Sequence, residues 1–477
     1  MKIGDSVMKK AVLAFYALFV AAGLCCAQNG AGCYAGYWNG VLSVGGQSIK
    51  MEFEILELQE GVVGKMNAQG VKGIPVEVSA GENGLELQVK QLGMKYSGVK
   101  MGNGIMGTFE QHGITAPLIL YPGKLEVNRP QTPKAPYPYK TEEVSFANAA
   151  EGATLTGTIT YPVGYETMKA KNVPVVVMVT GSGTQNRDEE IFDHKPFAVI
   201  ADWLARNGIA SLRYDDRGAG GSSKPVEGAT SENNAGDAKA AVAFVKGLKR
   251  FGKVGVLGHS EGGTIALMLA GERLPDFIIS LAGVATQGVD CIVWQNVVTL
   301  EGSGVPQQMA QDYGKALRGI YAERIKRFRE SVSSSEASVR LQGGAIPQAK
   351  EFIGKLCVDE GLKLPPQFVA NLEAVASSKS LWLDWFVWYN PAETVGKIKC
   401  PVMALNGSYD MQVPAEANLG VLRELLPANG KHLVKEYPQL NHLLQKCTRE
   451  TSLKYGDIEE TISQEVLEDI VQWIGSL

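Results

Sequence analysis

An excess of charge of one sign is the first thing that this sequence lacks. Its 477 residues carry 46 Lys and Arg against 50 Asp and Glu, a formal net charge of −4, with no long basic run. Proteins that bind nucleic acid neutralise its phosphates with clustered basic side chains. Nucleic acid is therefore not an expected partner.

Cysteine is scarce, and its pattern is not that of a scaffold. The chain has seven cysteines, two of them near the N-terminus, and no Cys-x-x-Cys pair. Neither a zinc site nor a disulfide framework is indicated by this spacing, although one or two disulfides remain open in an exported protein. Most of the remaining five are expected to be plain buried thiols, namely Cys33, Cys291, Cys357, Cys400 and Cys447.

Apolar runs long enough to span a membrane are also missing. Three early lysines precede the apolar run 11–24, and small residues follow up to Ala27. This pattern predicts a signal peptide over residues 1–27 rather than a spanning helix. We expect an exported protein, periplasmic or secreted, with surface attachment as an alternative. Lipidation at Cys25 or Cys26 ranks second to simple cleavage, because neither cysteine follows a small apolar residue.

The chain contains two regions that differ in their pattern of predicted secondary structure. Residues 28–125 are glycine-rich, with short strand-like segments such as 62–66 and 105–109 between turn signals. This spacing predicts a small antiparallel barrel or sandwich. No acid, base and nucleophile cluster there, so we expect a structural module, with ligand binding left open. Four prolines within residues 126–140 predict a semi-rigid linker.

Residues 141–477 alternate strand-like and helix-like segments. The continuous apolar run 174–180 predicts a central parallel strand buried on both faces, and the alternation predicts a doubly wound parallel sheet. Residues from about 285 to about 390 interrupt it with helix-like segments and the aromatic run 381–389. We expect a helical lid over the carboxyl ends of the strands, where ligands bind. Most of its aromatic residues should pack the lid, and one or two should line an acyl pocket.

The strongest motif runs from Gly258 to Gly262, where Gly-His-Ser-Glu-Gly lies between an apolar strand-like and an apolar helix-like segment. Gly-x-Ser-x-Gly in that setting is typical of a nucleophile elbow. The serine adopts a strained conformation at the turn, and the glycines let strand and helix approach closely. With 55 glycines in the chain the pattern also arises by chance. The flanking segments nevertheless favour chemistry at Ser260, where the helix dipole stabilises developing negative charge.

A serine hydroxyl attacks a carbonyl only when a base takes its proton, and a carboxylate usually orients that base. Of the five histidines, His442 alone sits in a loop just past a strand-like segment. Asp410 has the matching position one strand earlier. The order Ser260, Asp410, His442 is the nucleophile, acid and base order of one hydrolase fold. The sequence thus predicts a catalytic triad.

From about Lys140 to Leu477 the chain resembles the α/β-hydrolase superfamily. The segments Gly181–Glu189, Tyr214–Gly220 and Gly258–Gly263 are similar to those of serine-aminopeptidase-S33-like bacterial carboxylesterases of the EstD type. The resemblance implies Ser260 as nucleophile, Asp410 as acid and His442 as base. It implies no cofactor and no metal.

The same resemblance implies an oxyanion hole. One donor is the backbone N–H of Glu261, after the nucleophile, and the second is that of Ser182 or its neighbour Gly183. Losing one such donor typically costs ~2.7–4 kcal/mol of transition-state stabilisation. Nearby charged residues are expected to order the surrounding loops, namely Arg187, Asp188, Asp216 and Arg217.

These observations favour a serine carboxylesterase acting on short- to medium-chain acyl esters through an acyl-serine intermediate. The expected partner is a small-molecule acyl ester, and the sequence sets no oligomeric state. An S33-like serine aminopeptidase is the alternative within catalysis, although no charged anchor for a peptide terminus stands out in the predicted lid. A third hypothesis is a non-catalytic cell-surface binding protein, in which the N-terminal module captures glycan, lipid or polymer.

Overall fold

The structure, a computed structural model, describes most of the chain after the predicted signal peptide, which lies outside the described residues. The described ranges are 34–44, 47–58, 61–68, 71–81, 84–111, 113–125, 127–333, 336 and 341–477. The chain divides into two compact units, Met1–Asn128 and Arg129–Leu477. Within the described ranges, no helix is both long enough and apolar enough to cross a membrane.

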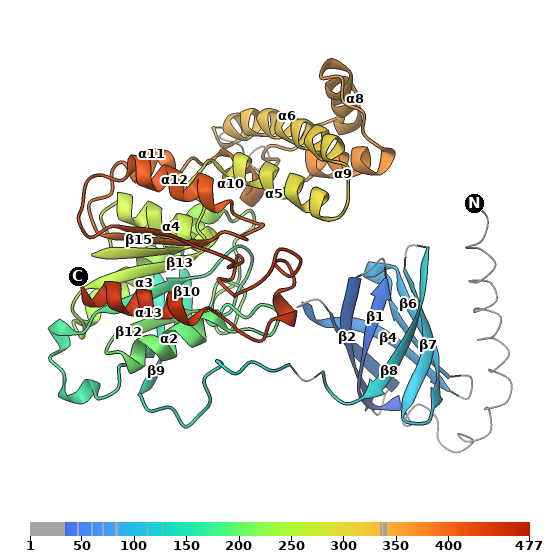
Figure 1. Cartoon of the computed structure of the whole chain (residues 1–477), viewed down its shortest axis with the longest axis horizontal. Helices are drawn as coiled ribbons and strands as arrows, with labels where there is room; N and C mark the ends of the chain where they lie inside the picture. The colour runs from blue at the N-terminus through green and yellow to red at the C-terminus, as the bar shows by residue number, and fades with distance from the viewer. Residues whose placement is uncertain are drawn as a thin grey trace. The chain divides into compact units, whose positions relative to one another are not determined.

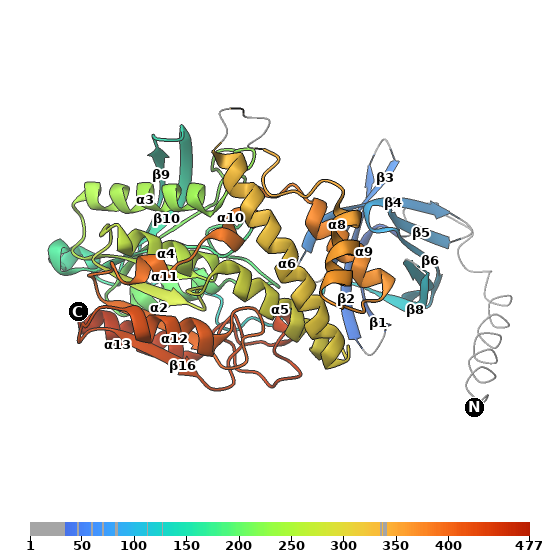
Figure 2. The same cartoon turned by 90° about the horizontal axis from the view of Figure 1, so that it is seen from above.

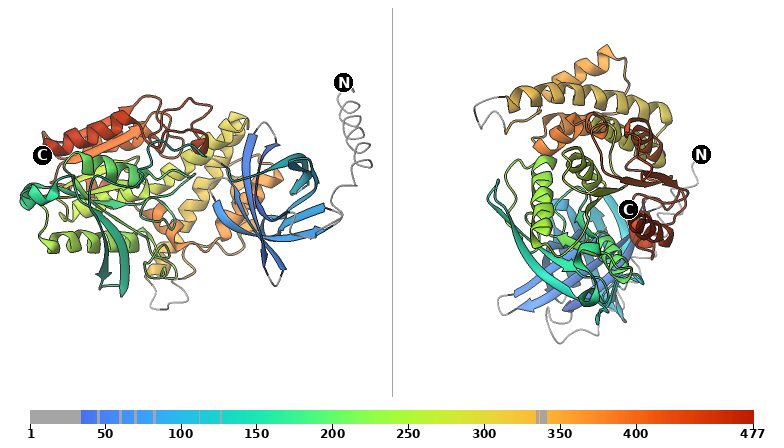
Figure 3. Two further views of the ribbon diagram at one scale, coloured as in Figure 1. Left: turned by 90° about the horizontal axis from the view of Figure 1, so that it is seen from below. Right: turned by 90° about the vertical axis from the view of Figure 1, so that its left-hand side faces the viewer.

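The N-terminal unit is a closed antiparallel barrel in which each strand pairs with the next and β8 pairs back with β1 (Figure 3). Along β5 the side chains of Leu85, Leu87 and Val89 are buried and those between them are exposed, as a half-buried strand requires. The predicted β module is therefore a barrel. Its strands are β1 (Gly36–Val44), β2 (Gln47–Leu58), β3 (Gly61–Ala68), β4 (Val71–Gly81), β5 (Gly84–Val89), β6 (Met94–Met101), β7 (Gly104–Gln111) and β8 (Ile114–Pro122).

Strand β6 was not among the segments expected from the sequence, because a glycine interrupts its apolar alternation. Met94 and Tyr96 point into the barrel, and Gly98 follows them on the same face. A Cβ built on Gly98 would lie 2.6 Å from the Tyr96 hydroxyl oxygen. The glycine therefore makes room for the buried tyrosine ring, a reason that only the folded barrel reveals.

The C-terminal unit is built on an eight-stranded sheet in the order β16-β15-β14-β13-β11-β12-β10-β9. The six strands from β11 to β16 run parallel, while β10 and β9 form an antiparallel edge. All five residues of β11 are buried, as predicted for a strand covered on both faces. The strands are β9 (Thr141–Asn148), β10 (Ala153–Thr160), β11 (Val175–Val179), β12 (Ala210–Tyr214), β13 (Val254–His259), β14 (Phe277–Leu281), β15 (Val402–Gly407) and β16 (Leu433–Tyr437).

Helices cover both faces of this sheet, which confirms the predicted doubly wound architecture (Figure 1). On β11, Val176 and Met178 pack with α2 (Pro196–Arg206) and α13 (Gln464–Gly475). Val175 and Val177 face the opposite layer, because successive side chains on a strand point to opposite faces. That layer consists of α3 (Ser231–Leu248), α4 (Glu261–Gly271), α11 (Ala392–Val395) and α12 (Ala415–Leu425).

The proline-rich segment after Asn128 is attached to the C-terminal unit. The Arg129 guanidinium donates to the backbone carbonyls of Phe192, Gly456 and Ile458. Further along, the Tyr139 hydroxyl donates to Asp202 at 2.8 Å. Residues 129–140 thus lie against this unit through specific contacts.

Between β14 and β15 the chain forms a helical lid with a hydrophobic core of its own (Figure 2). Most of its aromatic residues pack internally, as expected; the Trp385 and Tyr389 rings, for example, stack with centroids 4.6 Å apart. The lid helices are α5 (Gly288–Gly302), α6 (Gln307–Val332), α8 (Ala349–Asp359), α9 (Pro366–Ser377) and α10 (Leu381–Trp388).

A fully buried ion pair joins the lid helices. Arg324 on α6 contacts Asp384 on α10 at 2.7 Å, and both side chains are inaccessible to solvent. The guanidinium also donates to the carbonyls of Val375, Ala376 and Ser378, at and beyond the end of α9. The second oxygen of Asp384 accepts from the Gly344 amide at 2.7 Å. This one pair therefore connects α6, α9, α10 and the loop before α8.

We expect Asp384→Asn to destabilise the lid by about 3–5 kcal/mol, because it leaves the buried Arg324 cation without its countercharge. Chemical unfolding and limited proteolysis of residues 285–390 measure the effect. Asp290→Asn is the matched control on the same lid, since the Asp290–Arg318 pair is about half exposed and should contribute less than about 1 kcal/mol. Equal stabilities of the two variants would contradict this role.

Candidate active site

Ser260 stands at the sharp turn between β13 and α4, with φ 54° and ψ −117°. Residues with a Cβ rarely occupy this region, and strain of this kind concentrates at functional sites. The Ser260 amide donates to the carbonyl of Leu281 on β14 at 2.9 Å, and its carbonyl accepts from Gly263 at 2.9 Å. The residue is partly exposed. A strained, accessible serine between strand and helix is the geometry of a nucleophile elbow.

Two glycines flank the serine where the backbones come closest. A Cβ on Gly258 would lie 1.9 Å from the carbonyl oxygen of Gly262. A Cβ on Gly262 would lie 2.1 Å from the carbonyl oxygen of Val179, at the end of β11. Both clashes are with backbone atoms, so no side-chain rotation relieves them. The close approach that the motif predicted is present at both positions.

Asp410 and His442 meet at the carboxyl ends of β15 and β16. His442 Nδ1 lies 2.8 Å from Asp410 Oδ2, and both residues are buried. The other carboxylate oxygen, Oδ1, accepts from the amides of Gln412 and Val413, both at 2.8 Å. The carboxylate is therefore held in place while it orients the imidazole ring.

His442 contacts His259, the residue that precedes Ser260 in the elbow. The rings of His259 and His442 have centroids 4.8 Å apart, and His259 Nε2 lies 3.0 Å from the carbonyl oxygen of His442. Within the described chain, no hydrogen bond joins Ser260 Oγ to the His442 ring. The structure thus pairs Asp410 with His442 directly and places Ser260 next in sequence to a residue that contacts His442.

The predicted oxyanion donors belong to the start of α4 and to the loop after β11. Glu261 is the first residue of α4, so its N–H has no acceptor within the helix. Gly181, in the loop after β11, lies so close that a Cβ built on it would be 3.4 Å from Ser260 Cβ. Its amide already donates to Glu189 Oε1 at 2.7 Å, so it is not free to serve as an oxyanion donor. Ser182 and Gly183 are exposed, and their amides donate no hydrogen bond among the described residues, so they stay the candidates for the second donor.

Ion pairs order the loops next to the elbow, as expected from the sequence. Arg187 uses Nε and Nη2 to bind both oxygens of its carboxylate partner, a fork geometry that fixes the loop. The pairs are Arg187 with Asp215, Asp188 with Arg213, and Arg217 with Asp237.

Among the described residues Asp216 pairs with no cation, and it instead holds the loop after β11 through neutral donors. It accepts from the Gln185 amide at 2.8 Å and from the Thr180 hydroxyl at 2.9 Å. Burial raises the pKa of Asp216 to about 7, and the nearby carboxylates of Glu261 and Glu189 act in the same direction. The Asp216 carboxyl therefore changes charge near neutral pH, beside the candidate oxyanion donors.

We expect Asp216→Asn to gain stability relative to the wild type as the pH rises. The carboxyl titrates near 3.8 in a model peptide and near 7 in the folded protein, so between these values the folded state binds more protons than the unfolded state. Its stability therefore falls with rising pH across this window, whereas a neutral asparagine keeps both hydrogen bonds at every pH. Melting temperatures at pH 5 and pH 8 measure the change, and a constant difference between the two proteins would refute it.

One aromatic residue of the lid contacts the elbow and a second packs against it. Trp382 Nε1 donates to Glu261 Oε2 at 2.9 Å, and its ring stacks on Phe386 with centroids 5.4 Å apart. Phe386 packs against an apolar cluster that includes Val284 and Cys291. The sequence indicated an aromatic lid segment, but only the fold identifies Trp382 as the residue that contacts Glu261.

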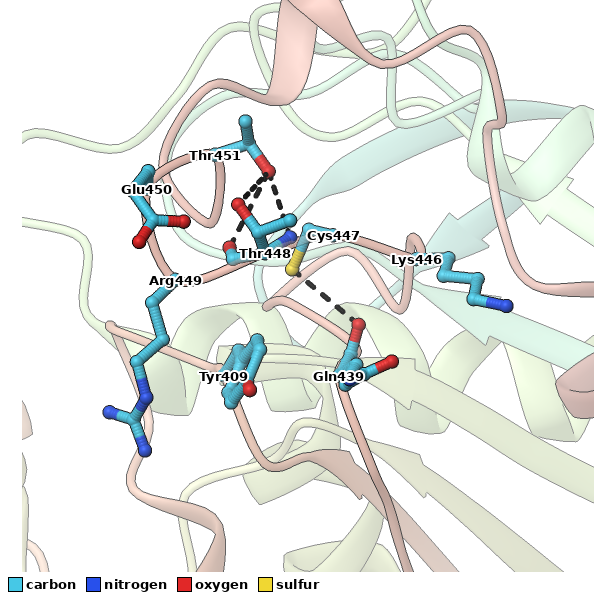
Figure 4. Close-up of a pocket in the computed structure, with 8 residues that line it drawn as sticks. All are labelled: Tyr409, Gln439, Lys446, Cys447, Thr448, Arg449, Glu450 and Thr451. Carbon is cyan, nitrogen blue, oxygen red and sulfur yellow. Dashed lines mark hydrogen bonds between the residues drawn. The ribbon is translucent and has the colours of Figure 1, made fainter.

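A surface pocket of about 530 Å³ lies close to the loops that carry Asp410 and His442 (Figure 4). Tyr409 and Gln439 line it, and the Arg449 guanidinium lies 5.0 Å from the Tyr409 ring centroid. Neither Ser260, Asp410 nor His442 is among its lining residues.

Parts of this chain are similar to known proteins. Esterase EstD of Thermotoga maritima is 25% identical over 326 residues, which cover 67% of this chain and 65% of EstD. The match thus spans just under two-thirds of that relative. Among solved structures, esterase Pf2001 of Pyrococcus furiosus is 14% identical in sequence, with TM-score 0.39. The match covers 74% of this chain and 99% of the Pf2001 chain. Est1E of Butyrivibrio proteoclasticus, solved with ferulic acid, is 16% identical, covers 70% and 99%, and has TM-score 0.38.

The alpha/beta hydrolase fold model matches residues 174–446, more than half of the chain. The matched range begins just before β11, includes the strained serine after β13 and ends just past His442. The fold, the elbow and this match agree. The chain belongs to the alpha/beta hydrolase fold family.

Proposed function

We propose that the protein is a serine carboxylesterase that hydrolyses short- to medium-chain acyl esters through an acyl-Ser260 intermediate. The observation that carries the proposal is the strained Ser260 after β13, at the same sheet edge as the hydrogen-bonded Asp410–His442 pair. The esterase name of the EstD relative supports the same reaction class.

In the proposed reaction, His442 Nε2 takes the proton of Ser260 as Oγ attacks the ester carbonyl carbon. The amide of Glu261, with that of Ser182 or Gly183, stabilises the oxyanion. Its collapse breaks the bond to the alcohol, which leaves with the proton from His442. Water then attacks the acyl carbon while His442 takes its proton. The bond to Ser260 Oγ breaks, the acid leaves, and His442 returns the proton to Ser260. The Ser260–His442 hydrogen bond is expected to form with substrate, because such bonds often tighten only in the complex.

We propose that an apolar acyl group of modest size binds where the lid packs near the elbow. Phe386 packs with Val284, Cys291 and Val413, and Asp410 is anchored next to Val413. The other three are buried and Phe386 is partly exposed, so Phe386 is the member of this apolar cluster that can meet an acyl group. Trp382, bonded to Glu261, closes the site on the side of α10.

Hydrolysis of p-nitrophenyl acetate, butyrate, octanoate and palmitate by wild type and Ser260→Ala tests the proposal. We expect the highest kcat/KM at butyrate or octanoate, and rates for Ser260→Ala near the uncatalysed background. Labelling with a fluorophosphonate probe should depend on Ser260 and His442. Faster turnover of aminoacyl-p-nitroanilides would indicate a peptidase, and absence of both turnover and labelling would indicate a binding protein.

We also propose that the protein is exported. The support is the lysine-rich start, the short apolar run and the small residues up to Ala27. N-terminal sequencing of protein recovered from the periplasm or medium should begin at Gln28, and recovery only of the uncleaved chain in the cytoplasm would reject export.

A further inference from the structure

The His259 ring is held between two hydrogen-bond acceptors. Its Nε2 lies 3.0 Å from the backbone carbonyl oxygen of His442, which can only accept. Its Nδ1 lies 2.9 Å from Glu189 Oε1, and that same oxygen accepts from the Gly181 amide at 2.7 Å. An imidazole that donates from both nitrogens is a cation.

The surroundings of this ring are closed and largely apolar. The Glu189 and His259 side chains are 3% and 10% exposed, and a small cavity beside them is lined mainly by apolar side chains: Pro196, Phe197, Ile200, Leu281, Leu443, Leu444 and Ile462. Burial alone lowers the pKa of His259, but the charge and hydrogen bond of Glu189 outweigh it and raise the pKa above its usual value. The other titratable groups facing the pair are Asp410 and His442 on the strand-end loops and Asp216 across from Glu189.

We propose that Glu189 and His259 form a buried carboxylate–imidazolium pair that positions three parts of the active site. Glu189 holds the loop of the candidate oxyanion donors through the Gly181 amide. His259 belongs to the nucleophile elbow, and its Nε2 fixes the backbone of His442. Both are positioning residues, and the inference rests on the proposed esterase function.

The charges of Glu189 and His259 also affect the electrostatic environment of His442. His442 becomes a cation when it takes the proton of Ser260, and the His259 ring lies beside it with centroids 4.8 Å apart. Two neighbouring imidazolium ions repel each other in an apolar site. Glu189 cancels the charge of His259, so the base experiences a nearly neutral neighbour. Removing only one member of the pair therefore changes the net charge beside the His442 ring.

His259→Asn and the double variant His259→Asn/Glu189→Gln isolate this charge. In both variants the asparagine amide at position 259 can still donate to residue 189, and both lose the hydrogen bond from the residue-259 ring to the His442 carbonyl. The two variants therefore differ only in the charge of residue 189. We expect kcat/KM for p-nitrophenyl butyrate to fall at least ~10-fold in both, since small displacements of catalytic groups are costly. The acid limb of the pH–kcat/KM profile should move up by roughly one pH unit in His259→Asn, where the unpaired anion stabilises protonated His442.

In the double variant the acid limb should return to the wild-type position while the loss of rate persists. Glu190→Gln, at the adjacent carboxylate, is the control and should match the wild type in rate and profile. An acid limb at the same pH in all four proteins, or one that moves down in His259→Asn, would overturn the charge role.

Histidine-selective ¹⁵N NMR of the full chain tests the pair without any substrate. At neutral pH both ring nitrogens of His259 should carry protons. His432 is the internal control with one ring proton, because its Nδ1 accepts from the Val402 amide and its Nε2 faces the carbonyl of Pro427. One proton on His259 would mean a protonated Glu189 and would reject the ion pair. If the wild type fails to hydrolyse esters, the proposed function fails, while this measurement still decides the protonation of His259.

Discussion

Asp410→Asn is expected to lower kcat for ester hydrolysis by about 10⁴-fold while leaving the fold intact. An asparagine can keep its oxygen toward the amides of Gln412 and Val413, which both bond Asp410 Oδ1. Its amide nitrogen would then face His442 Nδ1 and donate to it. The ring would carry its proton on Nε2 instead, the nitrogen that must accept the proton of Ser260. The variant would therefore hold the wrong tautomer in an otherwise unchanged site.

Steady-state kinetics on p-nitrophenyl butyrate and a melting curve for each protein measure this effect. Asp312→Asn, on lid helix α6 away from the strand ends, is the matched control and should keep wild-type kinetics. If Asp410→Asn retained more than about a tenth of the wild-type kcat, Asp410 would not be the partner of the base.

Gly262→Ala is expected to destabilise the protein by about 5 kcal/mol or more, a loss that few single substitutions reach. The new Cβ would lie 2.1 Å from the carbonyl oxygen of Val179 and 2.6 Å from that of Thr180. These atoms belong to the end of β11 and its loop, so α4 would have to move away from the centre of the sheet. We expect little soluble protein, or a strongly lowered melting temperature together with loss of fluorophosphonate labelling.

Gly247→Ala is the control for the glycine substitution itself. Gly247 lies in the last turns of α3, and a Cβ there meets nothing within 4 Å. Alanine is the better helix former, so this variant should gain about 0.5–1 kcal/mol. A similar stability for Gly262→Ala and the wild type would show that α4 is not constrained by the close approach.

Local patterns were enough to predict much of this architecture. The unbroken apolar run of β11 predicted a strand covered on both faces, and the alternation of strands and helices around it led to the doubly wound sheet that the structure has. In the N-terminal unit, short alternating strands indicated a barrel or a sandwich but did not choose between them. Closure depends on the pairing of β1 with β8, which no local pattern encodes.

The candidate site also contains residues that the sequence could predict and residues that only the fold revealed. Ser260 could be singled out because a nucleophile elbow needs adjacent residues in a fixed order, and such an order is readable along the chain. Glu189 lay within a segment that the family resemblance marked, yet nothing local indicated that it would meet His259, 70 positions later. The same holds for Trp382 of the lid, whose bond to Glu261 spans 121 positions.

By itself the sequence determined which segments become strands and helices, where the serine turns, and which residue types stand at the strand ends, because these properties depend on neighbours in the chain. The tertiary structure alone decided which charged groups share a buried space, which amides of the loop after β11 are already bonded, and which lid residue contacts Glu261. Those outcomes depend on burial and on distances across the sheet, and both arise only when distant segments pack together.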